Sequence, residues 1–148
     1  MTGGGTRTDS VRSALAEVPE QAALIVVHDA ARPLVTDEVI ERVITALEGG
    51  WDAVVPALSL TDTVKRVEGD AVMDTLDRDG LVAAQTPQAF VAAALRDALS
   101  TLQQSVAKSP DCAALVEARG GRVRVVPGDR RLVKVTEPAD LELIAGWL

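Results

Sequence analysis

A carboxylate and a guanidinium follow directly on an apolar run near the start of the sequence. Asp29 and Arg32 come just after the four apolar residues 24–27. In open α/β folds, ligands bind beyond the carboxyl ends of the strands, so these two side chains are well placed for function. An aspartate can hold Mg²⁺ through its oxygens, and an arginine can grip a phosphate with its planar fork. A local ion pair that only stabilises the loop explains the spacing equally well, because such pairs are common.

Hydroxyl and cationic side chains also gather in residues 61–79, where polar and apolar residues alternate on both sides of a glycine-containing turn. The alternation predicts a β-hairpin arm rather than a helix or a buried strand. Thr63 and Lys65 lie in the first half of this arm, and Arg78 lies at its far end. A hydroxyl and cations together suit a phosphate ligand, whereas an exposed hairpin with charges of both signs is more often simply solvated.

Two further candidates lie at the ends of predicted elements. Lys134 falls near the end of a short strand predicted over residues 132–135. From there it could reach a shared pocket as a phosphate partner, or it could extend from an apolar surface. Thr86 lies where a short strand gives way to a helix that we predict from about Pro87 to Leu102. The plainest explanation of Thr86 is a helix N-cap followed by proline at the first helical position.

Composition argues against several classes of function. The net charge of −7 is unfavourable for general binding to nucleic acids or anionic membranes, which need a basic surface. The single cysteine and single histidine argue against a disulfide framework and against a zinc site. No apolar stretch is long enough to cross a bilayer, and the first residues lack the pattern of a secretory signal. We therefore expect a cytoplasmic protein. Binding of a small anion stays open, because a pocket for it needs only a few local cations.

The elements that must position these side chains are strands and helices in alternation. Residues 24–27 and 53–56 are continuous apolar runs, which are typical of strands buried on both faces of a parallel sheet. Between them, residues 37–47 carry the apolar stripe of an amphipathic helix. The alternation predicts a single α/β domain over residues 1–148, with a mostly parallel sheet and the hairpin arm at about 61–79. Because such sheets usually begin with a strand and a ligand-binding turn, we expect opening strand–loop–helix units to be missing.

Six short motifs follow one another along the chain. They are residues 8–11 (TDSV), 28–33 (HDAARP), 61–65 (TDTVK), 77–81 (DRDGL), 85–88 (QTPQ) and 133–141 (VKVTEPADL). In order and in approximate spacing, the set resembles the 2-C-methyl-D-erythritol 4-phosphate cytidylyltransferase family across nearly the whole chain. The resemblance favours a functional interpretation of Asp29, Arg32, Arg78 and Lys134 over a purely structural one.

The resemblance implies a Rossmann-like nucleotidyltransferase of the non-mevalonate isoprenoid pathway. Such an enzyme joins CTP to 2-C-methyl-D-erythritol 4-phosphate, uses Mg²⁺, and forms the cytidine diphosphate derivative and pyrophosphate. The attacking phosphate is already an anion, so catalysis would depend mainly on positioning and on stabilisation of charge. The implied partners are CTP, a sugar-alcohol phosphate and a second copy of the chain, bound through the hairpin arm.

The resemblance also implies roles for individual residues. Arg78 and Lys134 would be the catalytic groups that position the methylerythritol phosphate for attack. The arm, with Thr63, would reach a site in the neighbouring subunit. The implied substrate-binding residues are Asp29, Arg32, Thr63, Lys65 and Thr86, with Asp9 and Ser10 in the nucleotide region and Asp29 also at the metal.

Two departures from the family pattern bear on activity. The family has a Thr-Asp pair where this sequence has Pro110-Asp111, and proline supplies no hydroxyl for a substrate contact, although Ser109 could substitute. The second departure is the missing Gly-rich loop, whose arginine and lysine stabilise the triphosphate, so we expect this chain alone to be inactive with CTP. Two alternatives stay open: transfer to ribitol 5-phosphate, and a non-catalytic module for dimerisation or substrate binding.

Overall fold

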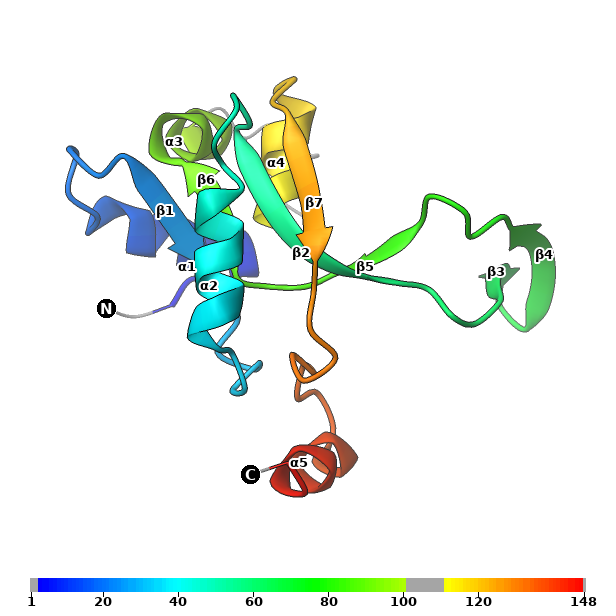
Figure 1. Ribbon diagram of the computed structural model, residues 1–148. Coiled ribbons are helices and arrows are strands. Elements are labelled where there is room, and N and C mark those ends of the chain that lie inside the picture. Colours follow the sequence, from blue (N-terminus) through cyan, green and yellow to red (C-terminus); the bar gives the residue numbers. More distant parts are fainter. Residues whose placement is uncertain (1–2, 101–110, 148) are drawn as a thin grey trace.

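A computed structural model of the chain describes residues 3–100 and 111–147. It shows one twisted sheet with helices on both faces and a separate two-stranded arm (Figure 1). In chain order the elements are α1 (Arg7–Ala16), β1 (Leu24–Val27), α2 (Asp37–Thr45), β2 (Ala53–Ser59), β3 (Val64–Glu68), β4 (Ala71–Leu76), β5 (Val82–Ala84), β6 (Gln88–Val91), α3 (Ala92–Ser100), α4 (Cys112–Ala118), β7 (Val123–Pro127) and α5 (Pro138–Ala145).

The α/β fold is confirmed, but the sheet is mixed rather than mostly parallel. Its strand order is β1-β6-β2-β5, and β7 pairs with the other side of β2. Strands β6 and β5 run antiparallel to their partners, and only the β2–β7 pair is parallel within the described part of the chain. As expected, β1, β2 and β7 run in the same direction. The antiparallel strand β6 is inserted between β1 and β2 and runs against both.

The prediction of a helix from Pro87 is wrong, because Gln88–Val91 forms strand β6 and α3 begins only at Ala92. The strand is buried on both faces: Phe90 faces one hydrophobic cluster and Ala89 the other. A strand of this kind lacks the polar–apolar alternation that marks a half-buried strand. The alanine-rich sequence that continues into α3 therefore concealed the boundary. The predicted end of the helix at Leu102 lies outside the described residues.

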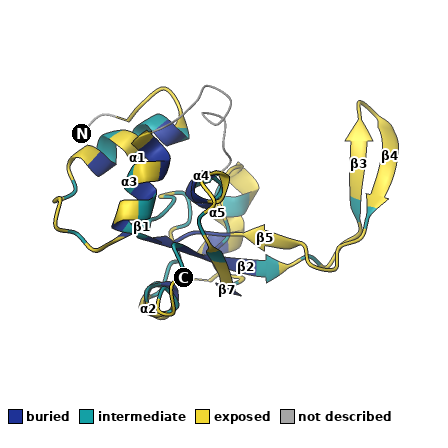
Figure 2. Cartoon of the chain, turned by 90° about the horizontal axis from the view of Figure 1, so that it is seen from above, coloured by how far each residue is buried: buried dark blue, intermediate teal, exposed yellow. Residues whose placement is uncertain are grey.

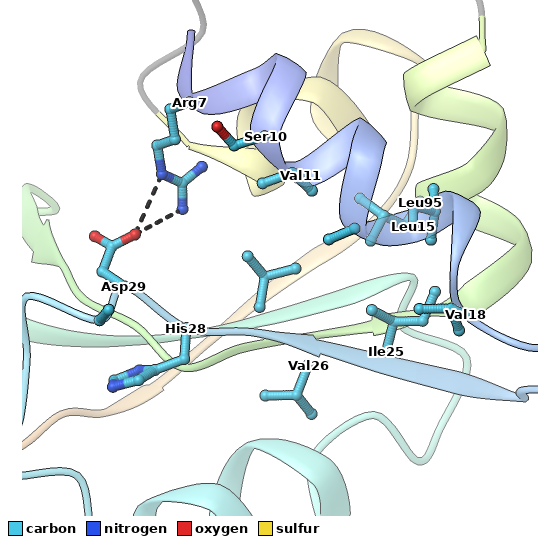
Figure 3. A pocket seen from close by; sticks show the side chains of 13 residues that line it. Arg7, Ser10, Val11, Leu15, Val18, Ile25, Val26, His28, Asp29 and Leu95 are labelled. Carbon is cyan, nitrogen blue, oxygen red and sulfur yellow. Dashed lines mark hydrogen bonds and ion pairs between the residues drawn. The ribbon is translucent and has the colours of Figure 1, made fainter. Parts of the chain in front are cut away.

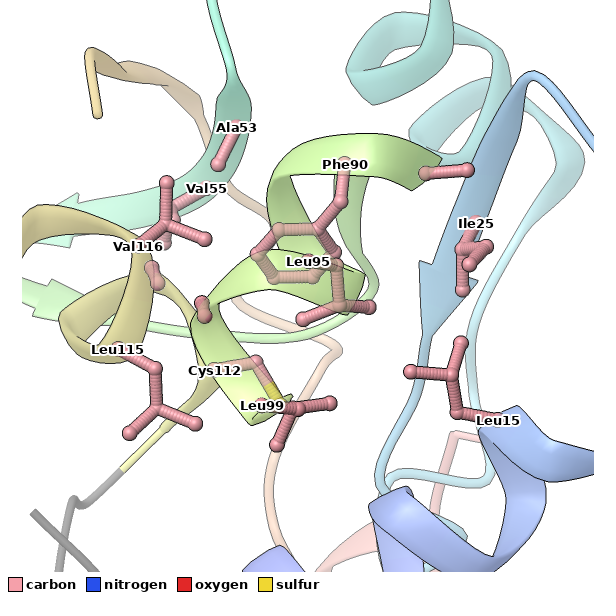
Figure 4. Packing of buried hydrophobic residues seen from close by; sticks show 13 residues of the cluster. Leu15, Ile25, Ala53, Val55, Phe90, Leu95, Leu99, Cys112, Leu115 and Val116 are labelled. Carbon is pink, nitrogen blue, oxygen red and sulfur yellow. The ribbon is translucent and has the colours of Figure 1, made fainter. Parts of the chain in front are cut away.

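Two hydrophobic clusters hold the helices to the sheet. The larger cluster lies between the sheet and helices α1, α3 and α4, with Phe90 and Leu95 fully buried within it (Figure 4). The smaller one lies on the opposite face, where Val43 of α2 packs against Val54 and Ala89. The predicted stripe of α2 is therefore confirmed. None of the described helices is long and apolar enough to span a bilayer.

Residues 61–79 form the predicted hairpin arm. Strands β3 and β4 pair only with each other and extend away from the body of the molecule (Figures 1 and 2). A bulge between Arg66 and Val67 shifts their register. The arm has large apolar side chains in solvent, with Val67, Val72 and Met73 between 59% and 60% exposed.

Candidate functional site

The carboxylate of Asp29 lies just beyond the end of β1, between two cations from opposite ends of the chain. Its Oδ1 atom accepts hydrogen bonds from Nε of Arg7 at 3.2 Å and from Nη2 of Arg7 at 3.1 Å (Figure 3). Its Oδ2 atom accepts a hydrogen bond from Nζ of Lys134 at 3.1 Å. The side chain of Asp29 is only 16% exposed, so solvent screens these interactions less than at an open surface.

The electrostatics of the site favour an ionised Asp29. Burial by itself would raise the pKa of Asp29, but hydrogen bonds and charge from Lys134 and Arg7 outweigh it and hold the pKa below its usual value. Burial lowers the pKa of the nearby Arg32 guanidinium, and the negative charge of Asp29 opposes that effect. Three cationic side chains therefore surround one carboxylate in a protein whose net charge is −7.

Thr86 fixes the loop that carries Asp29. Its hydroxyl oxygen accepts the backbone N–H of Asp29 at 3.0 Å and lies 3.1 Å from Nδ1 of His28. The other ring nitrogen of His28, Nε2, lies 3.0 Å from the carbonyl oxygen of Arg32. Because a carbonyl can only accept, Nε2 carries the proton, and Nδ1 accepts from the Thr86 hydroxyl. Thr86 is therefore not the expected helix cap, and instead it ties the end of β1 to the start of β6.

Replacing Thr86 by valine should lower the free energy of unfolding by about 1–3 kcal/mol, because the partly buried backbone N–H of Asp29 loses its acceptor. Thr86 is 3% exposed, so water cannot readily replace the hydroxyl. Urea unfolding followed by circular dichroism measures the effect. Thr45→Val, at an exposed position of α2, is the matched control. An equal decrease in the free energy of unfolding for the two variants would contradict the role assigned to Thr86.

The segment 132–135 carries Lys134 to Asp29, although it does not form the predicted strand. It is held as a loop, in which the N–H of Val135 donates to the carbonyl of Ala31 at 2.8 Å. Nη1 of Arg32 donates to the carbonyl of Leu132, while Nε of Arg32 is buried without a partner. These isolated hydrogen bonds anchor the loop, but they do not form the repeated backbone pairing that defines a β-strand.

Four of the predicted site residues thus come together from three segments: Asp29, Arg32, Thr86 and Lys134. The arm residues do not join them within one chain. Nζ of Lys65 donates to Thr75 Oγ1 at 2.6 Å, Nη1 of Arg78 donates to the carbonyl of Thr61, and Thr63 is exposed at the base of the arm. The predicted substitution site at Pro110 and Ser109 lies outside the described residues.

The predicted nucleotide-binding residues, Asp9 and Ser10, make local contacts around the start of α1. Asp9 accepts from the Thr6 hydroxyl at 2.8 Å and pairs with Arg12 at 3.0 Å. The hydroxyl of Ser10 accepts the N–H of Gly4 at 3.0 Å and donates to the carbonyl of Thr6 at 3.1 Å. These contacts order the Gly-rich segment in front of the helix, and they leave Asp9 about half exposed at its rim.

Sequence analysis missed Arg7, which contacts Asp29 directly, and missed that Cys112 lies beside it. Nη1 of Arg7 donates to the sulfur of Cys112 at 3.4 Å. Burial raises the pKa of the Cys112 thiol, although the charge of Arg7 opposes this effect. No spacing rule links residues 7, 29 and 112, so the only available signal was the position of Arg7 in the segment that precedes the TDSV motif.

A cavity of about 420 Å³ lies next to this cluster, between α1 and β1 (Figure 3). Arg7 and Asp29 stand at one end of it, and mostly apolar side chains of α1, β1 and α3 line the rest. The described residues contain no group of three or more His, Cys, Asp or Glu side chains that could hold a metal. Arg7 occupies Oδ1 of Asp29 and Lys134 leaves only one lone pair on Oδ2, so Asp29 could give a metal one oxygen at most and the described residues do not by themselves form a magnesium site.

Comparison with known proteins relates the whole chain to one family. Residues 1–148 match the family IspD: 2-C-methyl-D-erythritol 4-phosphate cytidylyltransferase. The chain is 44% identical over 141 residues to the enzyme of that name from Rubrobacter xylanophilus, covering 95% of this chain and 61% of that protein. It is 46% identical over 151 residues to the one from Frankia casuarinae, covering 100% of this chain and 55% of that protein. The chain thus spans less than two thirds of the length of these relatives.

Solved structures give the same result. The crystal structure of 2-C-methyl-D-erythritol 4-phosphate cytidylyltransferase from Thermus thermophilus is 35% identical and superposes with a TM-score of 0.89, covering 99% of this chain and 71% of that one. The enzyme of the same name from Francisella tularensis is also 35% identical, with a TM-score of 0.87 and coverage of 99% and 69%. The chain therefore belongs to the 2-C-methyl-D-erythritol 4-phosphate cytidylyltransferase family.

Proposed function

We propose that the chain takes part in the transfer of a cytidylyl group from CTP to 2-C-methyl-D-erythritol 4-phosphate. The observation that carries the proposal is the set of three cations around Asp29 at the end of β1, in an otherwise acidic protein. In the reaction, a phosphate oxygen of the acceptor attacks the α-phosphorus of CTP. A new P–O bond forms, the bond to the β-phosphate breaks, and pyrophosphate leaves with its electron pair. No proton has to be removed from the nucleophile.

The residues of the cluster would act mainly by positioning the acceptor. Lys134 and Arg32 would bind its phosphate, since both donate and neither can accept. Asp29 is the acceptor in the cluster and would bind hydroxyl groups of the sugar alcohol. Magnesium would enter with the nucleotide, because Mg²⁺ is commonly held by one or two carboxylates together with substrate phosphates. The remaining proposed contacts are Thr86 on the substrate side, Asp9 and Ser10 on the nucleotide side, and Thr63, Lys65 and the catalytic Arg78 from a partner subunit's arm.

The proposal includes a homodimer formed through the hairpin arm. Within one chain, Arg78 bonds to the arm's own backbone and Lys65 to its own Thr75, so neither reaches Asp29. An isolated two-stranded hairpin is only marginally stable in water, and this one exposes Val67, Val72 and Met73. Burial against a second subunit would cover these side chains and would bring the arm's cations to a site.

We place the enzyme in the cytoplasm, where the free thiol of Cys112 would stay reduced.

Binding of the acceptor tests this function. Calorimetric titration with 2-C-methyl-D-erythritol 4-phosphate should give saturable binding, and Lys134→Met should weaken it about 10–100-fold, the effect of losing one charged hydrogen bond. Arg124→Gln changes the net charge equally but acts on exposed β7, where Arg124 bonds to the Ala46 carbonyl, and should leave the affinity unchanged.

Two results would contradict the assignment. If Lys134→Met and Arg124→Gln bind the acceptor equally well, the cluster around Asp29 is not the phosphate site. If ribitol 5-phosphate binds more tightly than the methylerythritol phosphate, the site belongs to the alternative acceptor. Inorganic phosphate should bind more weakly than either, because it lacks the sugar-alcohol hydroxyl groups that would donate to Asp29 while the phosphate is held by the cations.

A further inference from the structure

Arg7 connects three parts of the fold through one guanidinium group. Nε and Nη2 both donate to Oδ1 of Asp29, and Nη1 donates to the sulfur of Cys112. The contacts join the first turn of α1 to the loop after β1 and to the first residue of α4. Cys112 is 1% exposed, whereas the Arg7 side chain is 29% exposed, so the third contact lies at the edge of the core, where it restrains the plane of the guanidinium.

The two oxygens of Asp29 are not equivalent as a result. An ionised carboxylate oxygen has two lone pairs. On Oδ1 both are taken by the two nitrogens of Arg7, whereas on Oδ2 only one is taken, by Lys134. One lone pair of Oδ2 is left for a further donor. The fork of Arg7 thus determines which oxygen of Asp29 can receive a ligand and fixes its orientation.

We propose that Arg7 is a positioning residue that holds the Asp29 carboxylate with Oδ2 toward the substrate. The inference rests on the proposed function, in which Asp29 accepts a hydroxyl of the sugar-alcohol phosphate. A charge alone does not suffice for this role. Lysine would keep the positive charge but has no planar fork, so it cannot occupy both lone pairs of Oδ1 while also contacting Cys112.

The test compares Arg7→Lys with Arg7→Ala, and with a lysine substitution in a similar arginine–aspartate ion pair away from the site. Arg119 binds Asp97 through the same two nitrogens, at 3.0 and 3.2 Å, on an exposed surface, so Arg119→Lys is the control. Titration with 2-C-methyl-D-erythritol 4-phosphate should show about tenfold weaker binding for both Arg7 variants, as is typical when a group that orients a ligand-binding residue is lost. Arg119→Lys should bind as the unchanged protein does.

A crystal structure of Arg7→Lys tests the inference independently of the function. We expect the Asp29 carboxylate to turn so that its oxygens no longer keep their places relative to Lys134. An unchanged carboxylate in that crystal, or Arg7→Lys binding at full strength, would overturn the positioning role and leave only a role for charge. If Lys134→Met also fails to weaken binding, the proposed function fails as well. If Lys134→Met weakens binding and Arg7→Lys does not, only the inference about Arg7 is lost.

Discussion

Replacing Phe90 by alanine should lower the free energy of unfolding by about 3–5 kcal/mol, which is the usual range for removing a fully buried aromatic side chain. Phe90 is the single phenylalanine of the chain and is 0% exposed. It lies in β6 opposite Ile25 on one side and Ala53 on the other, and Leu95 of α3 belongs to the same cluster (Figure 4). Because two strands and a helix meet at this ring, its removal leaves a cavity that no single side chain can fill.

Equilibrium unfolding in urea measures the loss, and Val125→Ala supplies the control. Val125 lies in β7 and is 54% exposed, so its truncation should change the free energy of unfolding by no more than about 0.5 kcal/mol. A loss below about 1 kcal/mol for Phe90→Ala would mean that the cluster collapses around the cavity. That result would contradict the close packing described for this face of the sheet.

Removal of the hairpin arm should abolish dimerisation while leaving the body of the protein folded. Val64 and Leu76 are paired across the arm, so a Gly-Gly linker can replace residues 64–76 without moving the chain on either side. The loss of Val67, Val72 and Met73 from an interface should raise the dimer dissociation constant at least about 100-fold, since each buried apolar anchor contributes on the order of 1–2 kcal/mol.

Light scattering coupled to size-exclusion chromatography measures the mass, and thermal unfolding shows whether the body is intact. Glu68→Gln, an exposed substitution beside the turn of the arm, is the control and should leave the mass unchanged. A deletion variant that keeps the dimer mass at the same concentration would show that another surface joins the subunits. The proposed contributions of Thr63, Lys65 and Arg78 to a partner's site would then have to be withdrawn.

Secondary structure could be predicted from the sequence for elements that bury one face, but not for the strand that is buried on both faces. Val39 and Val43 recur at the spacing of a helix with one buried face, and the arm alternates with the period of a strand, so both were predicted. Strand β6 is buried on both faces, so its sequence shows no alternation of polar and apolar residues. It could not be told from the alanine-rich helix that follows it, and the mixed character of the sheet was missed with it.

The site was predictable only in part for a related reason. The positions of Asp29 and Arg32 indicated a loop after a strand, and Lys134 and Thr86 were candidates at the ends of predicted elements, to which the family resemblance gave substrate roles. The structure does bring these residues to the same place. Arg7 was not found, because an ion pair between residues 7 and 29 depends on how α1 packs across the sheet. No local pattern in the sequence carries that information.

The Asp29 cluster also has a consequence for the order in which the protein matures during synthesis. The hydrogen bond between Asp29 and Lys134 joins residues that are 105 positions apart in the chain. Contacts of that span form late, because a long loop must close before they can be made. Arg7 precedes Asp29 in the chain, whereas Lys134 is synthesised much later. A nascent chain can therefore assemble the Arg7 side of the site before the ammonium group of Lys134 is available to complete it.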